Sequence, residues 1–256
     1  MILLFDIGAS KTRVAVTTDG QGFGEPKIVP TPAEPIAAAA ALAAAAAELT
    51  AGQSPRAVIG GLTRKRAAAA DEIRRLFPDL PVKIENDAAL CGLGEAHFGA
   101  GRGRQILAYL TVSTGVGGAR IVGGQIDQTS AGGGFEPGHQ IIDYREPFKP
   151  FEDYVSGAAV AAATGRSPRE TTDPAFWSAL AKTVAVGVHN LIVHWSPDRV
   201  VLGGGMFGSP GLRVDEVASE LSGFSKILLP LPELRPAALG DLGGLHGALV
   251  LSRSFP

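Results

Sequence analysis

The first residues that could do chemistry lie in the segment DIGASKT, Asp6–Thr12. Asp6 ends an apolar run, and Gly8, Lys11 and Thr12 follow it, so a carboxylate, a bare backbone, a cation and a hydroxyl share one turn. This combination is typical of a site that holds phosphate groups together with Mg²⁺. The same residue types also close ordinary β-turns, so the segment by itself leaves both interpretations open.

A second glycine-rich segment, Ser113–Gly118, follows the apolar run ILAYLTV. Its closely spaced glycines leave backbone N–H groups uncovered, and such groups can cradle an anion. The segment does not match G-x-x-x-x-G-K-[ST], so a P-loop fold is not indicated. An ordinary hairpin turn fits the same residues equally well.

Carboxylates and an imidazole provide the next candidates. Asn86 and Asp87 stand where a short apolar run gives way to a helical pattern, so Asp87 is either a helix cap or a carboxylate presented to a ligand. Glu136, His139 and Glu152 gather in a later, irregular stretch. These three residues could bind a polar ligand, or they could be solvated loop residues.

The run Gly203–Gly208 satisfies G-x-G-x-x-G after the apolar run VVL. Glu233 follows at about the distance expected of a ribose-binding acid, so a nicotinamide oxidoreductase must be considered, although a single match in so glycine-rich a chain is a weak signal. That interpretation leaves Asp6 and Asp87 without a use. The run could equally be a turn that lies against an adenosine.

Alternating strands and helices must position these segments. In the first half we expect strands at 2–5, 13–18, 27–29, 57–59 and 82–84, and helices at 34–49, 64–77 and 87–98. In the second half we expect a strand at 106–112, a hairpin at 117–126, strands at 199–202 and 227–229, and helices at 151–163, 174–195, 212–221 and 240–252. The order βββαβαβα therefore occurs twice, which predicts two similar α/β domains that face each other across a cleft and divide near residues 99–104.

Composition excludes several classes of protein. The chain has 256 residues, of which 45% are hydrophobic and 19% charged, as in a folded, core-forming protein. Its 23 basic and 25 acidic side chains give a net charge of −2, so we expect no nucleic-acid partner. Cys91 is the single cysteine, which rules out an internal disulfide and a multi-thiolate zinc site. We see neither a secretory signal nor a membrane span, and we expect a cytoplasmic protein without membrane contact.

Six segments together resemble the ROK family of sugar kinases and regulators, in order and in spacing. They are DIGASKTRVAV (6–16), ENDAAL (85–90) with GEAHFGAG (94–101), TVSTGVGGARIVGGQI (111–126), FEPGH (135–139), FEDYVSG (151–157) and VVLGGG (200–205). The resemblance implies two RNase H-like domains of the actin-like ATPase fold. The N-terminal domain would span residues 1–103 and the C-terminal domain 104–256, with the last helix, about 240–256, able to pack back onto the first domain.

The resemblance also implies an activity, namely transfer of the γ-phosphoryl group of ATP to a hydroxyl, by family habit the 6-hydroxyl, of a hexose or N-acetylhexosamine. Asp87 would be the general base, and Asp6 would hold Mg²⁺. The ATP contacts would come from Asp6, Gly8, Lys11, Thr12, Thr114, Gly115, Gly203, Gly204 and Gly205. The sugar contacts would come from Asn86, Asp87, Glu136, His139 and Glu152.

The chain departs from the family pattern in three places. Many members carry a CxCGxxGCxE zinc motif after the Gly-His pair, whereas the residues between His139 and Glu152 include no cysteine, so we expect no zinc. We expect packing to hold that segment instead, through Ile141, Ile142, Phe148 and Phe151. The segment 61–82 is short and Arg-rich where relatives carry a sugar loop, and no helix-turn-helix precedes Ile2, so the repressor branch is not expected. The alternative is a sugar- or nucleotide-binding regulator of the same fold with little turnover; a homodimer stays open.

Overall fold

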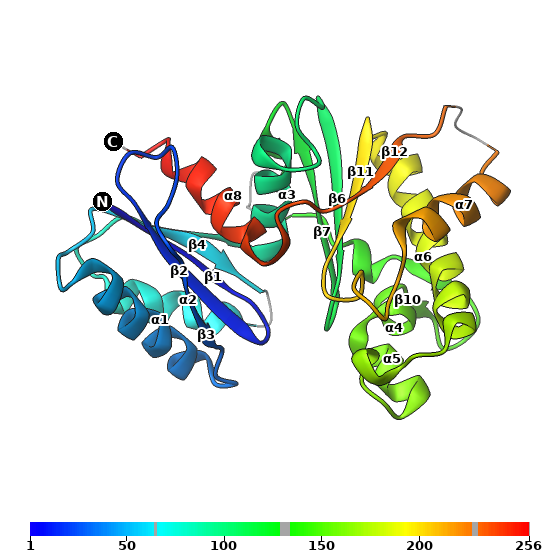
Figure 1. Ribbon diagram of the computed structural model, residues 1–256, viewed down its shortest axis with the longest axis horizontal. Coiled ribbons are helices and arrows are strands. Elements are labelled where there is room, and N and C mark those ends of the chain that lie inside the picture. The colour runs from blue at the N-terminus through cyan, green and yellow to red at the C-terminus, as the bar shows by residue number, and fades with distance from the viewer. Residues whose placement is uncertain (64–65, 129–133, 227–229, 256) are drawn as a thin grey trace. The chain divides into compact units, whose positions relative to one another are not determined.

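The structure is a computed structural model that describes residues 1–63, 66–128, 134–226 and 230–255. The chain forms two compact units (Figure 1). Unit 1 consists of Met1–Phe98 together with Asp241–Pro256, and unit 2 consists of Gly99–Gly240. From the sequence we predicted a domain boundary after residue 103, with residues of about 240–256 able to pack back onto the first domain. In the structure, the last helix is part of unit 1.

Unit 1 contains a five-stranded mixed sheet in the order β3-β2-β1-β4-β5. Its elements are β1 (Ile2–Ile7), β2 (Lys11–Thr17), β3 (Lys27–Pro30), α1 (Pro35–Thr50), β4 (Val58–Leu62), α2 (Ala67–Leu76), β5 (Val82–Asn86), α3 (Asp87–Phe98) and α8 (Gly243–Ser252). The first three strands pair antiparallel, and β1, β4 and β5 pair parallel. The predicted βββαβαβα order of the first half is confirmed.

The central strand β1 is buried along its whole length and presents two different faces. Leu3, Phe5 and Ile7 belong to one core cluster together with buried residues of α1 and α2. Because successive side chains of a strand point to opposite faces, Asp6 must point to the other face of the sheet. There α8 contacts β1 and β4, and it packs closely against α3.

The α3–α8 contact depends on a glycine. A Cβ atom at Gly247 would lie 2.0 Å from the backbone oxygen of Leu90, which is closer than any real Cβ contact. The two helices therefore approach each other backbone to backbone, and Leu245, Ala248 and Leu249 of α8 are buried. This packing ties residues from the end of the chain to the sheet that carries Asp6.

Unit 2 contains a second five-stranded sheet in the order β12-β11-β6-β7-β8. Its elements are β6 (Ile106–Val112), β7 (Val116–Val122), β8 (Gln125–Ile126), the 3-10 turn η2 (Pro137–His139), β9 (Ile141–Asp143), β10 (Lys149–Pro150), α4 (Glu152–Val155), α5 (Gly157–Thr164), η3 (Pro168–Glu170), α6 (Pro174–Trp195), β11 (Arg199–Gly203), α7 (Val214–Phe224), β12 (Glu233–Pro236) and η4 (Gly240–Leu242), the last of which continues into unit 1. The strand β6 pairs antiparallel with β7 and parallel with β11.

The long helix α6 has the predicted bounds and supplies much of the core of unit 2. Trp177, Val184, Val188 and Ile192 are buried in one cluster with residues of β6, β11 and α7. The helix is long and apolar enough to cross a membrane by length and composition, and half of its most apolar window is buried within the protein. Its apolar character is thus accounted for by core packing.

Other expectations need correction. The predicted helix 151–163 is two helices, because Ser156 has extended backbone geometry and its hydroxyl oxygen accepts a hydrogen bond from the Ala159 N–H at 3.1 Å, which begins α5. The predicted strand 227–229 lies outside the described residues, and the strand that pairs with β11 is β12. Ile141 and Phe148 are more than half exposed, whereas Phe151 is fully buried, so only part of the expected packing holds the segment 140–151.

Candidate active site

Asp6 lies near the end of β1, on the face of the sheet that α8 covers. Its side chain is almost fully buried, and a Cβ atom at Gly244 of α8 would lie 2.6 Å from the Asp6 Cγ, so only glycine leaves room for the carboxyl group. Burial raises the pKa of Asp6 to about 7, and the negative charge of Asp87 adds to the increase. Asp87 is therefore near enough for the two carboxylates to repel each other.

Two basic side chains from β2 partly neutralise this acidic group. The Arg13 Nη1 donates to the Asp6 Oδ2 at 3.2 Å, and its Nη2 lies 3.2 Å from the Asp241 Oδ1. The Lys11 Nζ lies 2.6 Å from the Asp241 Oδ2, and the hydrogen bond from Lys11 holds the pKa of Asp241 below its usual range. Arg13 and Asp241 were not among the predicted site residues. The sequence signal that could have pointed to Arg13 is the predicted pairing of the first two strands, because in its register Arg13 lies opposite Asp6.

The predicted phosphate contacts in and after the β1–β2 turn lie in two different environments, one exposed and one buried. The Gly8 N–H donates to the Lys11 oxygen at 3.1 Å and closes the turn, and the Lys11 side chain is half exposed. Thr12, by contrast, is fully buried, and its hydroxyl lies 2.9 Å from the hydroxyl of Thr31. The side chain of Thr12 therefore joins β2 to the segment after β3, and this geometry does not favour a contact with phosphate.

Asn86 and Asp87 stand at the junction of β5 and α3. The Asn86 Oδ1 accepts a hydrogen bond from the Ala89 N–H at 3.0 Å, so Asn86 and not Asp87 caps the helix. The Asp87 Oδ1 accepts from the N–H of Ala88 at 2.9 Å. A Cβ atom at Gly61 of β4 would lie 3.2 Å from the Asp87 Cα, so the neighbouring strand lies directly against this position.

In unit 2, the turn Ser113–Gly115 joins β6 to β7 and contacts the start of α4. The Glu152 Oε2 accepts a hydrogen bond from the Val116 N–H at 2.7 Å. The Ser113 oxygen accepts from the N–H of Gly157 at 2.7 Å. Three of the predicted site residues, Thr114, Gly115 and Glu152, are thus brought together within one unit.

The short turn η2 carries Glu136 and His139 and packs on β7. A Cβ atom at Gly138 would lie 2.6 Å from the Val116 oxygen, and Pro137 packs equally closely against Gly118 of β7. Glu136 is half-buried and His139 is exposed. The turn is therefore held through its proline and glycine, which leaves its polar side chains at the rim of the structure.

The glycine run after β11 is a tight turn back toward β6. Gly204 has φ +95°, and a Cβ atom there would lie 2.3 Å from the Val112 oxygen, which also accepts the Met206 N–H at 3.0 Å. Gly204 and Gly205 are exposed. Glu233 was the candidate ribose-binding acid of the oxidoreductase interpretation. In the structure its carboxylate instead forms ion pairs with Arg199 and Arg235 in the β11–β12 region.

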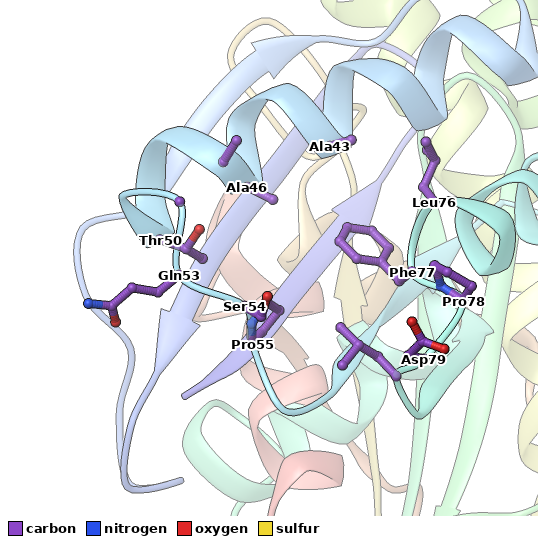
Figure 2. A pocket seen from close by; sticks show the side chains of 13 residues that line it. Ala43, Ala46, Thr50, Gln53, Ser54, Pro55, Leu76, Phe77, Pro78 and Asp79 are labelled. Carbon is purple, nitrogen blue, oxygen red and sulfur yellow. The ribbon is translucent and has the colours of Figure 1, made fainter.

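Two cavities in the described parts of the chain contain none of the predicted site residues. One, of about 340 Å³, has walls from α1 and from the turn after α2, with Ala46, Thr50 and Phe77 among its lining (Figure 2). The other, of about 570 Å³, is lined by residues that include Asp143, Tyr154 and Lys182. Among the described residues, no group of three or more His, Cys, Asp and Glu side chains is arranged to hold a metal ion.

Comparison with known proteins decides the family. Residues 70–254 match the ROK family. This chain belongs to the ROK family. It is 28% identical to the bifunctional enzyme NanE/NanK of Brucella melitensis over 99% of this chain and 54% of that protein, so it spans about half the length of that relative.

Solved ROK structures agree with this assignment over nearly the whole chain. The ROK hexokinase from Thermus thermophilus is 31% identical, with a TM-score of 0.76, and covers 97% of each chain. The ROK family glucokinase from Streptomyces griseus, solved in complex with glucose and AMPPNP, is 25% identical with a TM-score of 0.76, covering 98% of this chain and 99% of that one. The predicted two-domain, actin-like ATPase fold of the ROK family is confirmed.

Proposed function

We propose that this ROK protein is an ATP-dependent sugar kinase that transfers the γ-phosphoryl group to a hydroxyl of a hexose or N-acetylhexosamine, with the 6-hydroxyl as acceptor. The observation that carries the proposal is the pair of interacting carboxylates in unit 1, the buried Asp6 and the half-buried Asp87. Such a pair costs stability, because each negative charge opposes the other, and groups held in this way are concentrated at functional sites. The names of the ROK hexokinase and glucokinase relatives support the same reaction class.

Asp87 is the proposed general base. It is the first residue of α3, and its backbone is fixed by the neighbouring strand at Gly61 and by the Asn86 cap. A carboxylate held in this way can accept the proton of a sugar hydroxyl while that oxygen attacks the γ-phosphorus in line with the leaving oxygen of ADP. The rigid backbone matters because phosphoryl transfer depends mainly on positioning and charge neutralisation.

Asp6 is the proposed contact to Mg²⁺ bound with ATP, and the residues present fit that ion. Mg²⁺ is commonly held by one or two carboxylates, substrate phosphates and water, so a dedicated cage of protein ligands is not needed. Burial is the main cause of the raised pKa of Asp6, and the charge of Asp87 adds to it; a bound divalent cation would oppose both effects by favouring the charged carboxylate. The ion would supply charge neutralisation of the phosphates, and Lys11 would add a second cation from the same turn.

The remaining predicted residues keep their roles as proposals. Gly8, Thr114 and Gly115 would contact phosphate groups, and Gly203, Gly204 and Gly205 would lie along the adenosine. Asn86, Glu136, His139 and Glu152 would bind sugar hydroxyls. Thr12 is the exception, because its hydroxyl is buried against Thr31. We also propose that the protein acts in the cytoplasm on free ATP and sugar, without a nucleic-acid or membrane partner; its net charge of −2 is consistent with this.

Release of ADP tests the proposal directly. The protein is supplied with Mg²⁺ and ATP and with a panel of glucose, mannose, fructose, N-acetylglucosamine and N-acetylmannosamine, and ADP is measured by an enzyme-coupled assay. We expect sugar-dependent ADP release with at least one member, and a phosphosugar whose 6-position carries the phosphate by NMR. Stabilisation against heat by sugar or ATP without any ADP release would instead favour the sugar- or nucleotide-binding regulator.

A further inference from the structure

The turn Ser113–Gly115 is held at both ends by the segment that begins α4 and α5. The turn closes on itself, because the Ser113 N–H donates to the Gly115 oxygen at 2.8 Å. On one side the Ser113 oxygen accepts the Gly157 N–H, and on the other the Val116 N–H donates to the Glu152 Oε2, each at 2.7 Å. Of these two hydrogen bonds, the one to Glu152 involves a side chain, and the other joins two backbone groups.

Glu152 is itself held firmly in place. Glu152 follows Phe151, which is fully buried. The Phe151 ring packs directly on Gly187 of α6, because a Cβ atom at Gly187 would lie 2.5 Å from the Phe151 Cζ. The Phe151 N–H donates to the Gln140 oxygen at 2.8 Å. The side chain of Gln140 in turn accepts from the Asn190 Nδ2 of α6 at 2.9 Å. The position of the Glu152 backbone is thus fixed by the core of unit 2.

Gly115 is matched to this carboxylate. A Cβ atom at Gly115 would lie 2.7 Å from the Glu152 Oε2, closer than real Cβ atoms approach an oxygen. The backbone of Gly115 is not in the left-handed region, so its conformation does not demand glycine. A Cβ atom at this position would therefore have to displace the end of the Glu152 side chain that lies against it.

From this geometry we infer that Glu152 is a positioning residue, whose carboxylate sets the conformation of the Thr114–Gly115 turn through the Val116 N–H. The inference rests on the proposed function and deepens it, since it gives Glu152 a task toward the phosphate contacts in addition to its proposed contact with the sugar. A charge-assisted hydrogen bond to a backbone N–H is stronger than a neutral one and has a defined direction.

Hydrogen exchange at the Val116 amide tests the positioning role without any assay of activity. In Glu152→Ala we expect this amide to exchange about 10- to 100-fold faster, while the β6–β7 ladder amides beyond Gly118 keep their protection. Glu152→Gln retains an oxygen acceptor and should stay close to the wild type. Asp153→Ala, which removes the exposed neighbouring acid of α4, is the matched control and should change nothing. An unchanged Val116 amide in Glu152→Ala would overturn the inference.

A double-mutant cycle on activity provides the second readout. Gly115→Ala should raise KM for ATP and lower kcat, because the new methyl group displaces the Glu152 carboxylate. Once that carboxylate has been removed, the same substitution should cost little, so Gly115→Ala/Glu152→Ala should resemble Glu152→Ala alone. Additive losses would show that the two residues act independently and would refute the proposal.

The two experiments separate this inference from the proposed function. If the wild-type protein releases no ADP with any sugar, the proposed function fails, and exchange at Val116 still decides whether Glu152 positions the turn. If Glu152→Ala does not fold, Gly115→Ala in the otherwise unchanged chain supplies the exchange test. Faster exchange at Val116 in that variant supports the inference, and unchanged exchange contradicts it.

Discussion

At the scale of single residues, two carboxylates in one unit have different environments, which fit the different roles proposed for them. Asp6 is buried between β1 and α8, where its pKa is raised and where Arg13 is the cation that reaches it. Asp87 begins a helix and is half-buried. The first environment suits a group that meets a cation, and the second suits a group that accepts a proton from a ligand.

Replacing Asp87 by asparagine should abolish most of the turnover and leave ATP binding intact. General-base assistance contributes typically about 10²–10⁴-fold to rate, and an amide cannot accept the proton. Steady-state kinetics and calorimetric titration with ATP measure the two effects separately. Asp71→Asn, an exposed acid on α2, is the control and should behave as the wild type. Near-normal kcat in Asp87→Asn would remove Asp87 from the mechanism.

Replacing Asp6 by asparagine should change how stability depends on pH. The folded-state pKa of Asp6 is about 7 against a usual value of 3.8, so the folded state binds the proton more tightly than the unfolded state. The contribution of Asp6 to the free energy of unfolding is therefore full below about pH 4 and is lost as pH rises through 7. In the variant this loss is absent, because its side chain does not ionise.

We therefore expect the stability of Asp6→Asn relative to the wild type to be about 1–2 kcal/mol higher at pH 8 than at pH 5. This difference is smaller than the value for the full shift, because pH 5 to 8 covers only part of the interval between the unfolded and folded pKa values. Urea unfolding at both pH values, without Mg²⁺ or nucleotide, measures this difference. The same variant should lose activity. Equal pH dependence of the two proteins would mean that Asp6 is ionised at little cost.

At the scale of elements, the segment between η2 and α4 shows how a few anchored residues hold an otherwise exposed strand pair. Ile141 and Phe148 are exposed, and β9 and β10 form only a short ladder. The segment is anchored instead at its ends, by Gln140 on α6 and by the buried Phe151. Asp143 adds a local cluster, since hydrogen bonds from Arg145 and Tyr154 hold the pKa of its carboxyl group far below the usual range.

Because side-chain packing and hydrogen bonds within unit 2 anchor this segment, removal of metal should leave its structure unchanged. We expect elemental analysis of protein purified without added metal to find far less than one zinc per chain. Treatment with a zinc chelator, followed by gel filtration to remove the chelator and return to Mg²⁺, should preserve both the circular dichroism spectrum and the activity. One equivalent of zinc, lost together with activity, would contradict this expectation and show that the protein has a zinc site.

At the scale of the whole molecule, the two units differ in how the chain builds them. Unit 2 is one continuous segment, whereas unit 1 needs the last helix of the chain to cover the Asp6 face of its sheet. The buried side chains of α8 and the close approach at Gly247 make this helix part of the core of unit 1. Unit 1 can therefore be completed only after α8 has been synthesised.

Truncation after Gly240 tests this asymmetry. We expect the shortened chain to lose the order of unit 1, because the apolar face that α8 covers would be exposed to water, and to keep the order of unit 2. Limited proteolysis with mass spectrometry should then yield a resistant fragment close to residues 99–240, while residues 1–98 are degraded. The intact chain serves as the control. Comparable resistance of residues 1–98 in both proteins would show that α8 is dispensable.

The sequence by itself determined the order of elements in the first half, the bounds of α6, the family and the candidate acids Asp6, Asp87 and Glu152. These follow from patterns within short windows, namely apolar periodicity, glycine spacing and the conjunction of motifs. Only the tertiary structure decided that Arg13 pairs with both Asp6 and Asp241, that Asn86 caps α3, and that Glu152 reaches the Val116 N–H. Asp241 lies 228 positions from Arg13 along the chain, and no local pattern records a contact that forms only when α8 packs on β1. The strand at Glu233–Pro236 was missed for a similar reason, because its pairing with β11 is decided by the sheet and not by its own short, polar sequence.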